Sequence, residues 1–253
     1  MASAPASPLQ LCAVMPAYNE EECITAVVSR WIEALATVVP EMRLVVVNDG
    51  SRDQTGRILD ELKAREPRLV VIHQENGGHG AALYRGYREA LALNPGWVFQ
   101  VDSDDQFETT DFTRLWEARG SSKFLTGRRL VRHDALHRLI ITRILRFLNL
   151  LLFGCFIPDV NIPFRLIEAR YLTALLALIP PDTFAPNIFL AVLAARDGQN
   201  LHQIPVTHKD RQTGTVSIVR WRLIKACLRT ARELMGFRLH LGSRLRELGQ
   251  RGV

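Results

Sequence analysis

Short runs of β-forming residues alternate with helical segments along the first hundred residues. The runs at 11–15, 43–47 and 69–73 are rich in Val, Leu and Ile, and helical stretches separate them. A further run, 98–101, leads directly into a cluster of carboxylates. Strands that alternate with helices are typical of a mostly parallel sheet covered on both faces. The sequence therefore predicts a doubly wound α/β fold.

Two of these helices are expected to begin with a capping box, in which two residues three apart satisfy each other's backbone donors. Asn19 with Glu22, and Ser51 with Gln54, have this spacing. The capping boxes predict where the first two helices start.

Composition indicates a folded globular chain with one sizeable domain. The chain has 253 residues, of which 47% are hydrophobic and 23% charged. Four cysteines without a Cys-x-x-Cys pair predict reduced thiols, as in a cytosol. Residues 1–8 are small and polar, which predicts a disordered tail rather than a signal peptide. No uninterrupted apolar run reaches transmembrane length.

The net charge of +6 is concentrated in two segments. Residues 123–146 contain seven Lys or Arg and one Asp, and residues 220–253 contain nine Lys or Arg and two Glu. Such segments favour a partner with several negative charges, and phospholipid, a phosphorylated substrate and nucleic acid all qualify. Aromatic residues do not alternate with the basic ones, which argues against nucleic acid.

Three carboxylates, Asp102, Asp104 and Asp105, follow the strand predicted at 98–101 without an intervening Lys or Arg. The carboxyl ends of strands in an open α/β sheet are where ligands bind. Carboxylates gathered there repel one another unless a cation binds, and a hard divalent ion that shares a substrate's phosphates meets this need. An ordinary surface turn is the alternative interpretation.

Other strand ends carry residues suited to a nucleotide. Tyr18 offers a ring that can border a base, and Asp49 offers an acceptor for a base N–H or a ribose hydroxyl. Glycines at 77, 78 and 80 allow close backbone approach just before a helix N-terminus, which favours anions. For Asp49-Gly50-Ser51, a simple turn is the alternative.

Four motifs follow one another along the first half of the chain, at Pro16–Glu21, Val47–Thr55, Asn76–Ala82 and Asp102–Gln106. In sequence and order they resemble the successive motifs of family-2 glycosyltransferases. The resemblance implies a GT-A fold, a nucleotide-sugar donor, Mg²⁺ or Mn²⁺ as cofactor, and inversion of the anomeric centre. Two departures occur: Asn48 replaces the first Asp of the usual Asp-Asp-Gly-Ser, and His79 stands where a Lys or Arg is frequent.

Carried over by position, the resemblance assigns roles to single residues. The nucleotide-binding residues are expected to be Pro16, Tyr18, Glu20, Asp49, Gly80 and Asp102. Asp102 and Asp104 are expected to bind the metal and the diphosphate, with Asp104 catalytic. Gln106 corresponds to the further metal ligand of dolichol-phosphate mannose synthases.

The second half of the chain bears on the acceptor. Many relatives that glycosylate hydroxyls carry a Glu-Asp pair whose Asp is the general base, and the corresponding position here is Ala185-Pro186-Asn187. A sugar hydroxyl must lose a proton in the transition state, whereas a phosphate monoester is already ionised. The missing base favours a phosphate acceptor. Two alternatives remain, namely a hydroxyl acceptor with a base such as Asp159 and a silent protein that senses nucleotide-sugar.

Basic residues of the second half resemble the acceptor-phosphate positions of dolichol-phosphate mannose synthases. These residues are Arg128, Arg138, Thr142 and Arg211. Arg138 and Thr142 share one face of a basic amphipathic helix predicted at about 133–156. Arg211 opens a segment similar to the Arg-x-x-Gly-x-Ser loop of that subgroup, and is also expected to stabilise the leaving diphosphate. The subgroup's Lys just after that Ser is replaced, and Val216 and Ser217 stand there.

Together these features predict a GT-A domain at 9–218 and a basic helical extension at 219–253, with a closing helix at 219–235. The expected reaction is transfer of a sugar to a polyprenyl phosphate of the dolichyl or undecaprenyl type. The expected location is the cytoplasmic face of the membrane, where the basic helices would attach peripherally to anionic lipid. Solvated basic helices are the alternative.

Overall fold

The computed structural model describes residues 8–129, 136–198, 200–209 and 220–250, without the side chains of 136–142, 145–146, 220–227 and 250. The expected disordered tail, apart from residue 8, and the loop at 211–217 lie outside these residues. In chain order the elements are β1 (Leu11–Ala17), α1 (Ile24–Val38), β2 (Met42–Asp49), α2 (Thr55–Lys63), β3 (Leu69–Gln74), α3 (His79–Ala92), β4 (Trp97–Val101), α4 (Thr110–Glu117), the 3-10 helix η1 (Ala118–Ser121), β5 (Phe124–Arg129), α5 (Leu136–Phe153), β6 (Phe164–Glu168), α6 (Ala169–Leu176), α7 (Pro186–Arg196), β7 (Leu201–Val206) and α8 (Arg220–Gln250).

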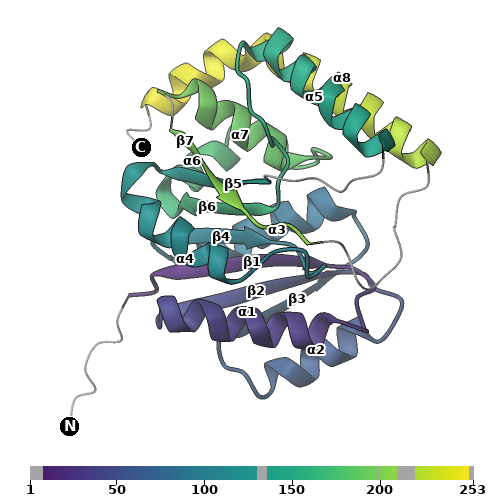
Figure 1. Ribbon diagram of the computed structural model, residues 1–253, viewed down its shortest axis with the longest axis vertical. Helices are drawn as coiled ribbons and strands as arrows, with labels where there is room; N and C mark the ends of the chain where they lie inside the picture. The colour runs from purple at the N-terminus through teal and green to yellow at the C-terminus, as the bar shows by residue number, and fades with distance from the viewer. Residues whose placement is uncertain (1–7, 130–135, 199, 210–219, 251–253) are drawn as a thin grey trace.

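The strands form one seven-stranded sheet in the order β3-β2-β1-β4-β6-β5-β7 (Figure 1). All neighbouring pairs are parallel except those of β6, which runs antiparallel to β4 and β5. The predicted mostly parallel α/β fold is confirmed. The antiparallel strand was not predicted, because 159–165 reads as a break between helices and the strand itself, Phe164–Glu168, is only five residues long and includes two charged residues.

Both faces of the sheet are buried, and the pleat of β1 shows why its sequence is apolar throughout. Cys12 and Val14 belong to one hydrophobic core, whereas Leu11, Ala13 and Met15 belong to the other. Successive side chains of a strand point to opposite faces, so a strand between two helical layers needs apolar residues at every position.

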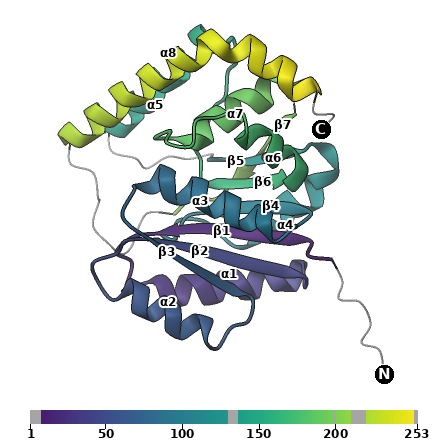
Figure 2. The same cartoon turned by 180° about the vertical axis from the view of Figure 1, so that it is seen from behind.

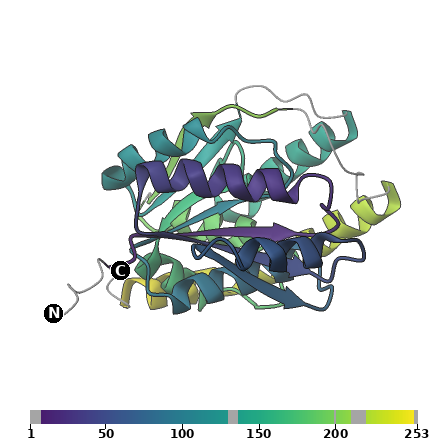
Figure 3. The same cartoon turned by 90° about the horizontal axis from the view of Figure 1, so that it is seen from below.

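Helices form layers on either side of the sheet. α1 and α4 cover one face, α1 running alongside the sheet (Figure 3), and α2 packs beside α1 next to β3. α3, α6 and α7 cover the other face (Figure 2). α5 and α8 form a further layer outside α7 (Figure 1).

The two expected capping boxes are wrong, because these side chains join two loops instead. α1 begins at Ile24 and α2 at Thr55, and neither has a side-chain cap. The backbone N–H of Asn19 donates to Ser51 Oγ at 3.0 Å, and Asn19 Oδ1 accepts from the N–H of Arg52 at 2.8 Å. The loops after β1 and β2 are thereby fixed to each other.

The closing helix is longer than predicted and is packed into the domain. One face of α8 is buried through Thr230, Leu234, Phe237, Leu241 and Leu248. The Phe237 ring lies 4.8 Å from that of Phe189 on α7 and 6.3 Å from that of Phe153 on α5. The expected boundary at 218/219 falls at the edge of the segment outside the described residues and stays a prediction.

Candidate active site

A cavity of about 590 Å³ opens at the carboxyl ends of β1, β2 and β4. The first turn of α3 and the segment 184–187 complete its wall. Five of the six residues expected around the nucleotide line this cavity, namely Pro16, Tyr18, Glu20, Asp49 and Asp102. The sheet thus brings together side chains that are up to 86 positions apart in the chain.

Asp49 is buried at the end of β2 and is held by backbone amides. Its Oδ1 accepts from Gln74 Nε2 at 2.7 Å and from the N–H of Gly77 at 2.9 Å, and its Oδ2 accepts from the N–H of Gly78 at 2.8 Å. Because a carboxylate accepts about four hydrogen bonds, part of its capacity remains for a ligand. The carboxylate is preorganised before a ligand arrives.

Asn48, the departure from the usual Asp, is a buried side chain that shapes the turn rather than the cavity wall. Its Oδ1 accepts from the N–H of Ser51 at 3.1 Å, and its Nδ2 lies 3.0 Å from His73 Nδ1. An amide can satisfy both contacts at once, because it offers an acceptor on one side and a donor on the other.

Gly80 lies behind the cavity wall and does not line it. A Cβ at this position would clash with the carbonyl oxygen of Phe184 and lie 2.9 Å from that of Thr183. Close packing of α3 against the segment 183–184 therefore requires a glycine here, and the expected place of Gly80 beside the nucleotide stays a prediction.

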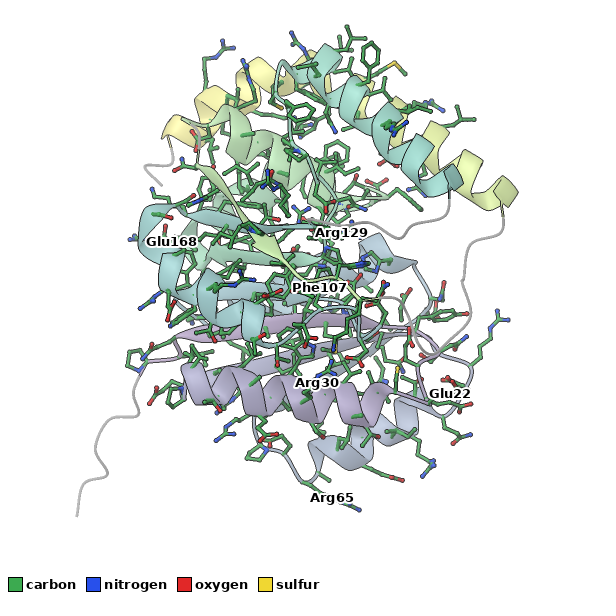
Figure 4. All side chains as sticks on the ribbon, viewed as in Figure 1. Glu22, Arg30, Arg65, Phe107, Arg129 and Glu168 are labelled. Carbon is green, nitrogen blue, oxygen red and sulfur yellow. The ribbon has the colours of Figure 1, made fainter. Side chains whose placement is uncertain are left out.

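The carboxylates after β4 separate into two groups. Asp102 and Asp104 line the cavity, with 21% of the Asp102 side chain exposed. Asp105 is in a left-handed conformation with φ of 59° and forms an ion pair with Arg30 on α1 (Figure 4 labels Arg30). Only two of these three carboxylates therefore line the cavity.

The Asp102 carboxylate has partners on β4 and on α3. Its Oδ1 accepts from Gln100 Nε2 at 3.3 Å and lies 3.8 Å from His79 Nε2 at the start of α3. Burial raises the pKa of the Asp102 carboxyl above its usual value, and His79 counteracts part of that shift. A buried carboxylate whose charged form is disfavoured gains from a bound cation.

Gln106, the expected third metal ligand, is engaged with the chain after β7. Its Nε2 donates to the carbonyl of Lys209 at 3.1 Å, and the N–H of Lys209 donates to the Gln106 carbonyl at 2.8 Å. Over the described residues, no group of three His, Cys, Asp or Glu side chains is arranged to hold a metal. Two carboxylates facing a cavity fit an ion that completes its shell with water and substrate phosphate.

The residues expected to bind the acceptor phosphate are only partly described. Arg128 is exposed near the end of β5. Arg138 and Thr142 fall on the first turns of α5, but their side chains lie outside the described set, as does the whole of Arg211. Their roles remain predictions.

Asp159, considered above as a base, is buried and paired with a guanidinium. Its two oxygens accept from Arg129 Nε at 2.8 Å and from a terminal nitrogen of Arg129 at 3.0 Å (Figure 4 labels Arg129). Both oxygens of the Asp159 carboxylate are therefore engaged by the guanidinium. The geometry does not favour a general base at Asp159.

A buried polar network behind Asp102 was missed from the sequence. It joins Tyr87 on α3, Gln100 on β4 and Asn187 on α7, and all three are buried. Arg165 on β6 donates to the carbonyl of Asn187 at 2.7 Å, and burial lowers its pKa to about 10. A glutamine in the centre of an apolar strand was the available signal, since buried polar groups need partners.

Comparison with known proteins agrees with this geometry. The sequence model of glycosyl transferase family 2 matches residues 12–140. Polyprenol monophosphomannose synthase of Mycolicibacterium smegmatis is 26% identical over 79% of this chain and 78% of the relative. Undecaprenyl-phosphate mannosyltransferase of Micrococcus luteus is 25% identical over 85% of this chain and 95% of the relative.

A solved structure shares the fold. Glucosyl-3-phosphoglycerate synthase from Mycobacterium tuberculosis, crystallised with Mn²⁺, UDP-glucose and phosphoglyceric acid, superimposes with a TM-score of 0.62 at 19% identity, covering 90% of this chain and 79% of that one. The fold and the acidic cavity define a glycosyltransferase of the GT-A type. The chain belongs to glycosyl transferase family 2 and is homologous to polyprenyl-phosphate sugar transferases.

Proposed function

We propose that this protein transfers a sugar from a nucleotide-sugar to a polyprenyl phosphate, with inversion at the anomeric carbon. The observation that carries the proposal is the acceptor side of the cavity. Asn187, where a base would stand, is a neutral amide, and the Asp159 carboxylate is held by Arg129. A phosphate nucleophile needs no base, and the names of the two relatives point to the same class of acceptor.

On the donor side, the nucleotide occupies the part of the cavity between Tyr18 and Asp49. Asp102 and Asp104 would hold a Mg²⁺ or Mn²⁺ ion together with the diphosphate, and the ion would neutralise charge on the leaving group. The start of α3 adds its positive dipole end on the same side. His79 Nε2, which lies 3.8 Å from Asp102 Oδ1, is on the same side.

On the acceptor side, Arg128, Arg138, Thr142 and Arg211 orient the phosphate. A phosphate oxygen attacks the anomeric carbon from the face opposite the nucleoside diphosphate, so that one C–O bond forms as the other breaks. Arginine forks suit this role because they bind two oxygens of a phosphate at once. Arg211 also stabilises the departing diphosphate.

Incubation with a panel of nucleotide-sugars, Mg²⁺ or Mn²⁺ and a short polyprenyl phosphate tests the proposal. We expect one donor to give a lipid-linked sugar whose phosphodiester bond to the sugar is cleaved by mild acid. Mass spectrometry before and after acid treatment measures this. A product stable to acid would indicate a hydroxyl acceptor, and binding of nucleotide-sugar without turnover on any acceptor would indicate a sensor.

The outer layer of α5 and α8 supports attachment to a membrane surface. Among the described residues, no helix is long and apolar enough to cross a bilayer. On α8, Leu228, Met235 and Leu239 are 67%, 53% and 82% exposed, and their spacing places them on one face, opposite the buried face.

α5 repeats this pattern with Ile144, Phe147 and Leu151, which are 52%, 64% and 68% exposed. Exposed Arg143 and Arg232 accompany these apolar residues. Apolar side chains flanked by arginines suit the interface of an anionic bilayer, so we place the protein peripherally at the cytoplasmic membrane face.

Substitution of the exposed apolar residues should therefore release the protein from vesicles. We expect Phe147→Glu with Leu151→Glu to lower partitioning onto phosphatidylglycerol-containing vesicles by about tenfold or more, since each side chain loses burial in the interface. Sedimentation measures the bound fraction. Leu93→Glu, at the exposed end of α3, is the matched control. Binding that is equal for all variants, or absent for the wild type, would favour solvated helices.

A further inference from the structure

Asn187 and Gln100 form a hydrogen-bond chain that ends on the carboxylate of Asp102. Tyr87 Oη lies 3.1 Å from Asn187 Oδ1, Asn187 Nδ2 donates to Gln100 Oε1 at 3.0 Å, and Gln100 Nε2 donates to Asp102 Oδ1 at 3.3 Å. Gln100 is fully buried and Asn187 is 2% exposed. The chain spans α3, α7 and β4, and so links the acceptor side of the cavity to the expected metal-binding side.

The direction of this chain follows from its last member. An ionised carboxylate only accepts hydrogen bonds, so Gln100 must present its NH₂ group to Asp102 and its carbonyl oxygen to Asn187. Asn187 must then present its NH₂ group to Gln100 and its carbonyl oxygen to Tyr87. Burial raises the pKa of Tyr87, which keeps its hydroxyl protonated and able to donate.

Both amides in this chain act as donor and acceptor at once, which a carboxylate cannot do. A carboxylate at position 187 could accept from Tyr87 but could not donate to Gln100. The carboxylates at positions 187 and 102 would then compete for hydrogen bonds from the single NH₂ group of Gln100. A carboxylate at position 187 would therefore weaken the anchoring of Asp102, even though Tyr87 Oη also lies 3.3 Å from Gln100 Oε1.

We propose that Asn187 and Gln100 are positioning residues that orient the Asp102 carboxylate for the metal and diphosphate, and that Asn187 is not the remnant of a general base. This inference rests on the proposed function, because it assigns Asp102 to the metal site. Arg165 supports it from behind by fixing the backbone of Asn187 at the start of α7. Partners behind a metal ligand commonly change metal affinity or activity by about 10- to 100-fold when they are removed.

The test is a titration of the protein with Mn²⁺ in the presence of UDP or GDP, with free Mn²⁺ followed by electron paramagnetic resonance. We expect Asn187→Asp to weaken Mn²⁺ binding by about 10- to 100-fold. Gln100→Met removes the same link from the strand side and should have a similar effect. Tyr87→Phe loses the hydroxyl contacts with Asn187 Oδ1 and, at 3.3 Å, with Gln100 Oε1, but it keeps both amides and the bond from Gln100 to Asp102, so its effect should be the smallest of the three.

Turnover measured against Mn²⁺ concentration separates positioning from base chemistry. A positioning role predicts that Asn187→Asp needs more Mn²⁺ for half-maximal rate and that saturating Mn²⁺ restores part of kcat. Thermal unfolding checks that each variant is folded, and Gln100→Met decides the matter if Asn187→Asp does not fold.

Three results would overturn the inference. They are unchanged Mn²⁺ affinity in a folded Asn187→Asp or Gln100→Met, an equal loss in Tyr87→Phe, and a gain in rate for Asn187→Asp that grows with pH. A wild-type protein that binds no Mn²⁺ with either nucleotide would overturn the proposed metal site and this inference with it. Failure of the proposed metal site and failure of the positioning role can therefore be told apart.

Discussion

Asp102→Asn and Asp104→Asn should each lower kcat for sugar transfer by about 10²- to 10³-fold, the scale for loss of one preorganised electrostatic group. Each substitution keeps the size of the side chain and removes a negative charge that faces the cavity. The bound metal would lose a ligand charge, and the leaving diphosphate would be stabilised less. Transfer of radiolabelled sugar to polyprenyl phosphate measures the loss, and circular dichroism checks the fold.

Asp105→Asn is the matched control for this experiment. Asp105 is the immediate neighbour, but its side chain pairs with Arg30 rather than facing the cavity. Asparagine also tolerates the left-handed conformation found there. Activity of Asp105→Asn should therefore stay close to that of the wild type. A wild-type enzyme that is indifferent to chelator, or equal losses in all three variants, would contradict the metal role of Asp102 and Asp104.

Arg128→Ala and Arg211→Ala should each reduce transfer to a polyprenyl phosphate by about 10- to 100-fold, because a charge-assisted hydrogen bond contributes about 1.5–3 kcal/mol. Lysine at either position should restore only part of the rate, since a point charge cannot reproduce a bidentate fork. Initial rates against acceptor concentration measure the effect. Arg85→Ala is the control, because Arg85 is an exposed arginine that pairs with Glu89 along α3.

The opposite pattern would identify a hydroxyl acceptor. Arginine variants that retain full activity, together with a wild-type rate that rises with pH through the titration of a base, would remove the phosphate-acceptor assignment. The metal-dependent glycosyltransferase would remain. Asp159→Ala is a poor probe here, because it would leave the half-buried Arg129 without its carboxylate and so destabilise the fold.

The sequence determined the class of fold and most of the cavity. Alternating strands and helices depend on local residue patterns, and β1 to β4 appear within two or three residues of the predicted positions. Polar residues at strand ends meet at one edge of a parallel sheet, so their convergence follows from topology. Five of the six expected nucleotide-side residues line the cavity for this reason.

The tertiary structure alone decided which polar groups face the cavity. Asp102, Asp104 and Asp105 are close neighbours with the same chemistry, yet the backbone at Asp105 sends the third carboxylate to Arg30. Asn19 and Ser51 look like helix caps, but their partners lie more than thirty positions away. A hydrogen bond with a distant partner has no signature in local spacing.

Pairing between residues that are distant in the sequence also explains why β6 and the hydrogen-bond chain behind Asp102 were not predicted. A five-residue antiparallel strand is short in sequence and is defined by its pairing with β4 and β5. Gln100 and Asn187 are 87 positions apart and become partners only when α7 packs on the sheet. The sequence fixes which chemical groups are available, whereas burial decides which of them must satisfy one another, because an unpaired polar group in the core costs free energy.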